Sequence, residues 1–420
     1  MNRKQRGVIG AGLLAAAALL LNLTGCAARV RAENLMAGIT PQTVKADALT
    51  EPQSAALTDF AVRLLRESAA ADGKNTLVSP LSVLYALGMT ANGAEGETRQ
   101  QMEAALGLPV GELNACLYSY RQALSDGDSA LRLANSVWFT ADARFTANQD
   151  FLQKNADYYG ADVFSAPFDD RTCREINRWV KTNTDGMIPE ILDQIPEDAV
   201  MYLVNALAFE AEWARTYTAD QVSPGQFTAA DGAKREVEFL SGTESAYLED
   251  DKAAGFLKYY ADGRTALAAL LPKEGVSVSD YIASLDGAAL SALLKAPQTA
   301  EVMTAIPKFS TEFSLELSGV CKAMGMPRAF DGGSAEFAGL GTSAKGNIFI
   351  GRVLHKTFLS VGEQGTKAGA ATVVEMKDEC AAVGAPEAKR VILDRPFVYM
   401  LIDCASGVPF FIGALTEPAA

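Results

Sequence analysis

The sequence NTLVSPLSVLYALGMTANGAEGET, residues 75–98, contains two consecutive helix-start patterns. Ser79 can cap a helix that opens with Pro80, because a serine hydroxyl accepts a hydrogen bond from a free backbone N–H and proline fits the first helical position. Val83, Leu84 and Leu87 then follow at helical spacing. The segment therefore predicts a helix that begins at Pro80.

The second pattern begins at Thr98, which forms a capping box with Gln101 and predicts another helix. Gly107 is expected to end that helix, since glycine readily adopts the left-handed conformation found after a last helical turn. Upstream, apolar residues between Leu57 and Leu65 share one helical face. The first third of the chain is therefore expected to be mainly helical.

The second half of the chain is richer in strands. Residues 302–306 and 398–402 are apolar runs typical of buried strands. Residues 397–404 and 409–414 are joined by a short turn at 405–407 and predict a hairpin. Helices and strands follow each other without regular alternation, which favours a large α+β fold over a doubly wound sheet.

Composition excludes several function classes. The 420 residues include 37 Lys and Arg against 51 Asp and Glu, a net charge of −14. A chain with this net negative charge lacks the excess of Lys and Arg residues that nucleic-acid binding requires. His355 is the single histidine, which leaves too few imidazoles for a typical zinc site. We expect no metal and no cofactor.

The N-terminus has the pattern of a secretory signal. A basic start, Arg3 to Arg6, precedes the apolar run Val8 to Leu21, which is too short for an ordinary membrane span. The run leads to Leu23-Thr24-Gly25-Cys26, which looks like a bacterial lipobox. We expect residues 1–25 to be removed and Cys26 to carry a lipid that anchors the protein on the extracellular face of a bacterial membrane. The alternative is a plain secretory signal that releases the protein. Residues 26–50 are expected to form a tether, and residues 51–420 the folded domain.

Ten segments between about residues 52 and 417 together resemble the serpin family, in order and at family spacing. They are residues 75–82, 92–98, 177–180, 184–188, 203–206 with Trp213, 306–309, 324–326, 353–356, 365–366 and 395–397. The resemblance implies three β-sheets, about nine helices and an exposed reactive loop at about residues 363–394. It also implies an inhibitor of serine proteases: the protease cuts the loop and is trapped as a covalent acyl-enzyme, while the loop inserts into the main sheet.

The loop sequence agrees with insertion on physical grounds, because a strand that enters a sheet buries alternate side chains. The hinge glycine is Gly365. From Thr366 to Met376 the even-numbered residues are uncharged, and the lysines and glutamate between residues 367 and 377 are all odd-numbered. Only Asp378, at the far end, breaks the pattern. The inward residues nearest the hinge are small, and no proline interrupts them: Thr366, Ala368, Ala370 and Thr372. A mobile surface loop or an ordinary edge strand is the alternative.

The resemblance also implies where the loop is cut, about fourteen residues after the hinge glycine. This count from Gly365 reaches the bond Glu379–Cys380, to within one or two residues, because the chain that follows is longer than usual. Small residues at 380–382 favour an elastase-like protease. Glu379 would alternatively suit a protease that prefers glutamate.

Other positions take their expected roles from the same resemblance. Ser79, Ser82, Asn205 and His355 map to a buried polar cluster that controls opening of the main sheet. Glu363 maps to a carboxylate that pairs with Lys308 and holds the top of the sheet closed around Trp213.

Several activities are not expected. As a catalytic base, His355 would need a nucleophile, but the sequence contains no G-x-S-x-G nucleophile elbow. A hydrolytic enzyme is therefore disfavoured. Residues 109–132 carry only two basic residues, so heparin activation is not expected. The protein is expected to be a monomer whose partner is a serine protease. The alternative function is that of a non-inhibitory serpin that binds or carries a ligand.

Overall fold

The structure is a computed structural model whose compact unit runs from Glu33 to the C-terminus. It describes residues 32–72, 74–125, 131–141, 145–195, 201–344, 346–366 and 388–418. Within these ranges no helix is long and apolar enough to cross a membrane.

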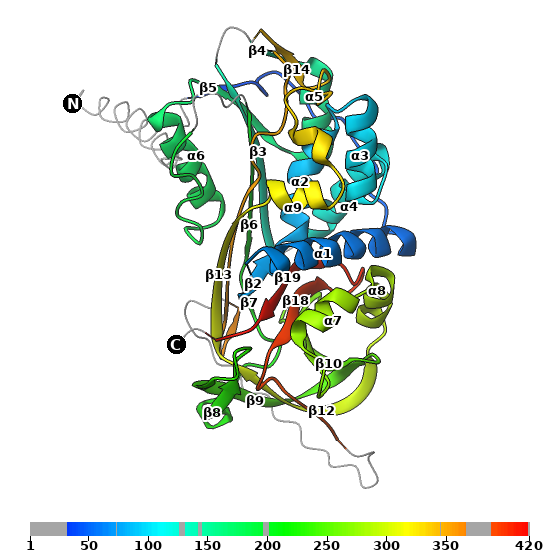
Figure 1. Ribbon diagram of the computed structural model, residues 1–420, viewed down its shortest axis with the longest axis vertical. Coiled ribbons are helices and arrows are strands. Elements are labelled where there is room, and N and C mark those ends of the chain that lie inside the picture. The colour runs from blue at the N-terminus through cyan, green and yellow to red at the C-terminus, as the bar shows by residue number, and fades with distance from the viewer. Residues whose placement is uncertain are drawn as a thin grey trace, which may run out of the picture. The chain divides into compact units, whose positions relative to one another are not determined.

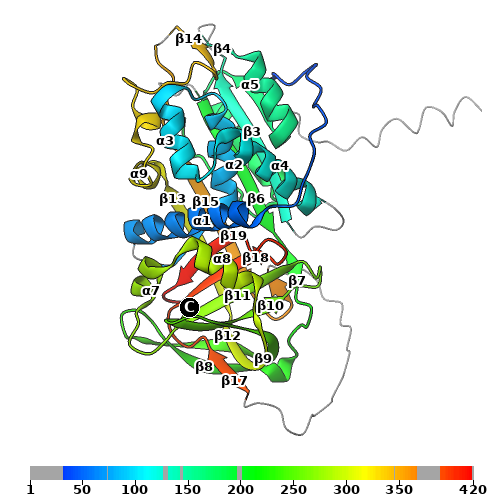
Figure 2. The ribbon, with the colours of Figure 1, turned by 90° about the vertical axis from the view of Figure 1, so that its right-hand side faces the viewer.

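Nine α-helices are present in the described ranges, in agreement with the expected number. They are α1 Glu51–Asp72, α2 Pro80–Ala91, α3 Gly96–Leu106, α4 Val110–Ser125, α5 Gln149–Lys154, α6 Asp170–Asn183, α7 Val278–Ser284, α8 Gly287–Lys295 and α9 Ser318–Ala323. Helix α2 begins at Pro80 as predicted, and the Ser79 hydroxyl accepts a hydrogen bond from the Ser82 N–H. Every residue of α2 is buried. Helix α1 lies across the middle of the unit, with α2–α5 on one side of it and the strands β9–β12 on the other (Figures 1 and 2).

The predicted capping box of α3 is wrong. The helix already begins at Gly96, so Thr98 lies in its first turn. The free N–H groups of Glu97 and Thr98 donate instead to the Glu336 carboxylate, at 2.9 and 3.3 Å. A residue 238 positions away thus replaces the local cap. Gly107 ends the helix as predicted, with φ 86°.

The largest sheet has nine strands and contains the predicted hairpin. In the order of pairing it comprises β17 Lys389–Ile392, β12 Gln298–Pro307, β9 Lys234–Glu249, β10 Ala253–Tyr259, β11 Thr265–Pro272, β18 Phe397–Asp403, β19 Pro409–Leu415 and β2 Thr76–Val78, with β8 Val222–Thr228 beside β9. Every residue of β11, β18 and β19 is buried, so these strands form the centre of the core. Strand β17 pairs with β12, so residues 389–392 lie in this sheet although the range predicted for the reactive loop extends to about residue 394.

Two further four-stranded sheets together correspond to the main sheet that the resemblance implies, and we call them its two halves. One half is β1 Glu33–Asn34, β5 Asp162–Ala166, β3 Leu131–Thr140 and β6 Met201–Phe209; the other is β13 Phe309–Glu316, β15 Leu354–Val361, β16 Gly365–Thr366 and β7 Ala211–Glu212. Strand β6 continues into β7 after one residue, so the halves share a layer (Figure 1). In the described part of the chain, no strand pair joins β6 to β15. A two-stranded sheet, β4 Phe145–Ala147 with β14 Gly341–Ser343, completes the fold.

The predicted boundary between tether and domain at residue 50 is also wrong. Strand β1 pairs with β5, and the Leu35 N–H donates to Val163 O at 2.9 Å. Further along, the Gln42 N–H donates to Asp157 at 2.7 Å. Ile39 and Leu49 pack against the core. These apolar residues are spaced too irregularly to predict a helix or strand, yet their burial makes residues 33–50 part of the folded unit.

Candidate functional site

The segment predicted to be the hinge of a reactive loop, Gly365 and Thr366, lies within the main sheet. After β15 the chain reverses at residues 362–364, and β16 then lies between β15 and β7, with Thr366 opposite both Val361 and Ala211. Thr366 is 1% exposed, and its hydroxyl forms a hydrogen bond with Tyr260 Oη at 2.5 Å. The side chain of Thr366 thus lies on the buried side of the sheet. Ala368, Ala370, Thr372, Glu379 and Cys380 lie outside the described residues, as does Cys26.

Gly365 is required by the close approach of β7. A Cβ atom at this position would lie 2.0 Å from Ala211 O and 2.8 Å from the Glu212 Cα. Both contacts are with backbone, which cannot move aside without breaking the pairing of β16 with β7. Only glycine therefore allows the chain to enter the sheet here.

Trp213 and Tyr217 hold the reversal that precedes the hinge. The Trp213 indole N–H donates to Gly362 O at 2.8 Å, and its backbone N–H donates to Gln364 O at 2.8 Å. The Tyr217 N–H donates to Glu363 O at 3.0 Å. Three successive carbonyl groups are thus fixed by one short segment. Trp213 is 2% exposed and stacks on the Tyr260 ring, with centroids 4.4 Å apart.

The predicted ion pair between Glu363 and Lys308 is present, with Nζ to Oε1 at 2.7 Å. Lys308 also contacts Glu238 on β9 at 2.7 Å, which the sequence did not reveal. The hydrogen bonds that Lys308 donates to Glu238 and Glu363 raise the pKa of Lys308, and the same bond to Glu363 lowers the pKa of that carboxylate. Both groups are about one-third exposed, so the attraction is partly screened. The pair connects the reversal at 362–364 to the β12–β13 corner.

The four residues expected to form a polar cluster lie together below the hinge. The Ser79 N–H donates to His355 Nε2 at 3.0 Å, and the Ser79 hydroxyl donates to Phe410 O at 2.9 Å. The Ser82 hydroxyl donates to Asn205 Oδ1, and the Asn205 amide donates to Asn135 Oδ1. Sequence reasoning missed Asn135, because its position opposite Asn205 depends on the pairing of β3 with β6. The cluster connects α2 to both halves of the main sheet.

His355 is a buried hydrogen-bond acceptor. It is 5% exposed, and burial lowers its pKa from 6.5 to about 4. The ring is therefore neutral near pH 7, with Nε2 occupied by the Ser79 N–H. A neutral, backbone-bonded imidazole stabilises the packing of α2 against β15.

Acidification between pH 6.5 and pH 4 is expected to destabilise the fold through His355. In this window the unfolded chain binds a proton that the folded chain does not, so the free energy of unfolding falls as the pH falls. The full loss is roughly 3 kcal/mol, from a pKa difference of about 2.5. Urea unfolding at several pH values should show a shallower dependence between about pH 5 and 6.5 for His355→Asn, whose side-chain oxygen still accepts from Ser79. Equal slopes for wild type and variant would contradict this role.

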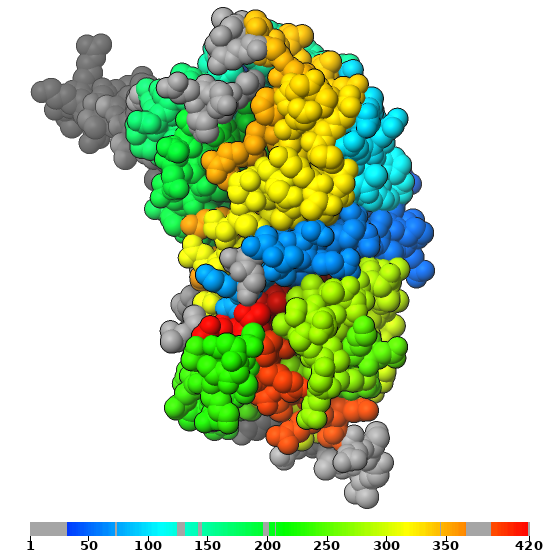
Figure 3. Space-filling view, viewed as in Figure 1, coloured from blue at the N-terminus to red at the C-terminus, as the bar shows by residue number. Residues whose placement is uncertain are grey.

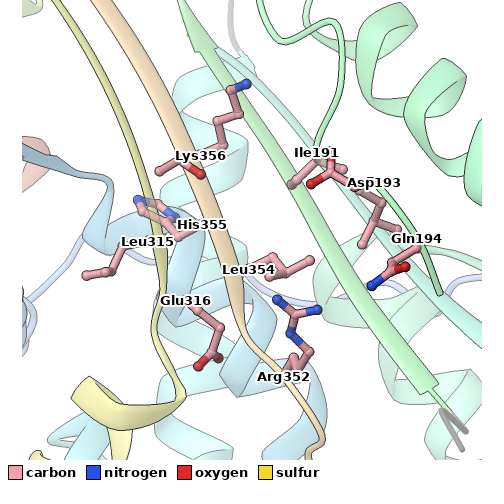
Figure 4. A pocket seen from close by; sticks show the side chains of 11 residues that line it. Ile191, Asp193, Gln194, Leu315, Glu316, Arg352, Leu354, His355 and Lys356 are labelled. Carbon is pink, nitrogen blue, oxygen red and sulfur yellow. The ribbon is translucent and has the colours of Figure 1, made fainter. Parts of the chain in front are cut away.

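A cavity of about 280 Å³ lies beside this cluster. It is lined by residues of β13 and β15, by Arg352 just before β15, and by residues 191–194, which follow α6 (Figure 4). In the space-filling view, the green surface of α6 lies next to the orange and yellow surface of later residues (Figure 3).

Comparison with known proteins identifies the family. The model of the family described as serpin (serine protease inhibitor) matches residues 55–418. An uncharacterised serpin-like protein of Thermococcus kodakarensis is 29% identical over 392 residues, 90% of each chain. Ipis-1 of Ixodes persulcatus is 30% identical over 355 residues, 82% of this chain and 92% of the relative.

Solved structures lead to the same family. The native state of tengpin, a thermophilic serpin, superposes with a TM-score of 0.86 at 42% identity, covering 92% of this chain and 100% of tengpin. Its latent state gives a TM-score of 0.78 at 40% identity, covering 89% and 100%. The chain therefore belongs to the serpin family, whose members generally inhibit serine proteases.

Proposed function

We propose that this serpin inhibits serine proteases as a suicide substrate: the protease attacks the reactive loop, the acyl-enzyme forms, and the loop inserts into the main sheet before the ester is hydrolysed. The observation that carries the proposal is the position of β16. The first two residues of the loop already pair between β15 and β7, with Thr366 buried. Insertion would extend this existing strand.

The arrangement of β6 and β15 supports continued insertion. The two strands border the place that an extended β16 would occupy, and among the described residues neither pairs with the other. A new central strand would satisfy backbone groups of both neighbours. Its uncharged face would point toward the core, since the even-numbered residues follow the register of Thr366.

The proposed cleavage site is the bond Glu379–Cys380. Residues 365–379, extended at about 3.3 Å each, span roughly 50 Å, enough to carry a bound protease far along the sheet. The small residues after the bond favour elastase-like serine proteases. Proteases that cut after glutamate are the alternative, because Glu379 directly precedes the proposed bond. Lys377 lies two residues before the proposed bond, and Lys389 and Arg390 lie in β17, well beyond it, so trypsin-like targets are not favoured.

A carrier function is the alternative. Thyroxine-binding globulin in complex with thyroxine superposes with a TM-score of 0.75, but at 24% identity this likeness concerns the fold alone. The small, uncharged inward residues after Gly365 favour inhibition instead.

We further propose that the protein is a monomer, anchored through Cys26 outside a bacterial cell. The lipobox-like sequence supports the anchor. Incorporation of labelled palmitate that is lost in Cys26→Ala would test it, and equal labelling of that variant would refute it.

Denaturing gels with a panel of serine proteases test the inhibitory function. An elastase-like or glutamate-preferring protease is expected to give a detergent-resistant complex, and mass spectrometry should place the cut within two residues of Glu379. A trypsin-like protease serves as the comparison. Complete loop cleavage by all three classes without any complex would show that the protein is only a substrate.

A further inference from the structure

Lys258, near the end of β10, is a buried lysine next to the residues that hold the hinge. It is 2% exposed. Its ammonium donates to Glu244 Oε1 at 2.9 Å and to Arg215 O at 3.2 Å. Burial lowers its pKa, and Glu244 opposes this effect. An ammonium group is costly to bury even when it is paired, so ordinary packing does not explain its presence.

The same ammonium lies over two aromatic rings. Its Nζ atom is 4.3 Å from the centroid of Tyr217 and 5.2 Å from that of Trp213. Both distances are within the range of cation–π attraction, which is stronger when the cation is desolvated. These are the residues whose N–H groups hold the carbonyls of Gly362 to Gln364. Lys258 therefore contacts both supports of the chain reversal before the hinge.

Tyr260, two residues after Lys258, contributes to the same support. It stacks on Trp213 and forms a hydrogen bond with Thr366. Lys258 near the end of β10 and Tyr260 just after it thus both contact Trp213, and Tyr260 also contacts the hinge. If the two rings moved, the three donors that fix the reversal would move with them.

We propose that Lys258 is a positioning residue that clamps Trp213 and Tyr217 against the chain reversal at 362–364 and thereby sets the lifetime of the form with an uninserted loop. The proposal deepens the proposed inhibitory function, since it concerns when the loop inserts. In a purely structural role, Lys258 would matter only through its ion pair with Glu244. In the proposed role, Lys258 matters because its ammonium group holds the rings of Trp213 and Tyr217 in place.

Tyr217 offers a matched pair of variants that leave the ion pair intact. Its hydroxyl is buried and has no hydrogen-bond partner within the described ranges, so Tyr217→Phe keeps the ring and should behave as wild type. Tyr217→Leu removes the ring and keeps the backbone N–H. It should increase hydrogen exchange at the amides of residues 213 and 217, and shorten the half-life of the uninserted form, each by about tenfold. Lys258→Met should have the same effects.

The double variant Lys258→Met with Glu244→Gln separates positioning from ion-pair stability. It leaves no unpaired buried carboxylate, so it is expected to fold even if Lys258→Met does not. Under the proposal it keeps fast amide exchange and a short half-life. Recovery of wild-type exchange and half-life in the double variant, or wild-type behaviour of Tyr217→Leu, would overturn the proposal.

The readouts distinguish this inference from the inhibitory function. Amide exchange at residues 213 and 217 requires neither a protease nor loop insertion. If the cleaved wild-type protein gains no thermal stability, the inhibitory function fails while the exchange data still test the clamp. If cleavage does stabilise the protein but Tyr217→Leu exchanges and converts like wild type, only the clamp fails.

Discussion

Thr366→Arg is expected to convert the protein from an inhibitor into a substrate. Thr366 is buried between β15 and β7, against Tyr260, and insertion of the loop must keep it there. An arginine at this position would bury its charged guanidinium group without an ion-pair partner, which costs several kcal/mol of desolvation free energy. Loop insertion would then be slower than hydrolysis of the acyl-enzyme. The fraction of protease trapped as covalent complex should therefore fall at least about a hundredfold. The ratio of covalent complex to cleaved serpin on denaturing gels measures this fraction.

The matched control is Lys367→Arg, at the next residue. The alternation of the loop predicts that this side chain lies on the outer face, where an arginine stays in water. The control should trap a protease as well as wild type does. Undiminished complex formation by Thr366→Arg would show that this residue does not have to remain buried, and would contradict the insertion register.

Glu363→Lys is expected to shorten the lifetime of the active monomer. The substitution removes the 2.7 Å contact with Lys308 and places two ammonium groups together beside the chain reversal. Lost attraction and new repulsion at this partly exposed site amount to about 1–2 kcal/mol, or roughly a 5–30-fold faster conversion. Native gels over time at fixed temperature would follow the loss of monomer to self-association or to an inactive inserted form.

Glu238→Lys is the control for this effect. Glu238 contacts the same ammonium of Lys308 at the same 2.7 Å, but it lies on β9 and does not hold the reversal. It should therefore alter monomer lifetime less than Glu363→Lys does. Equal lifetimes for both variants would mean that only the charge balance around Lys308 matters, and a wild-type lifetime for Glu363→Lys would refute the pairing as a control point.

The parts of the fold that the sequence predicts well depend on local chemistry or on uninterrupted periodicity. The start of α2 follows from a serine and a proline next to an apolar helix face. The β18–β19 hairpin follows from two apolar runs with a short turn. At the site, the inward position of Thr366 follows from the alternation of charged and uncharged residues, and the Glu363–Lys308 contact follows from family resemblance.

The parts that the sequence does not predict depend on contacts between distant segments. The N-terminus of α3 is capped by Glu336, which no local pattern can reveal. Residues 33–50 look like a linker because their few apolar residues have no period, yet they pack on the core. Lys258 reads as one polar residue in the apolar run GFLKYY. Its role emerges only when β9 and β10 bring it to Glu244 and to the two aromatic rings.

Thermal melting before and after cleavage of the loop tests the central claim most directly. A metalloprotease forms no acyl-enzyme and cannot be trapped, so one that cuts near residue 379 would free the loop without forming a complex. If the loop then becomes a central strand, several side chains are newly buried, and the melting temperature should rise by about 10 °C or more. Thr366→Arg, cleaved at the same bond, should gain less. An unchanged or lower melting temperature for the cleaved wild-type protein would contradict the account.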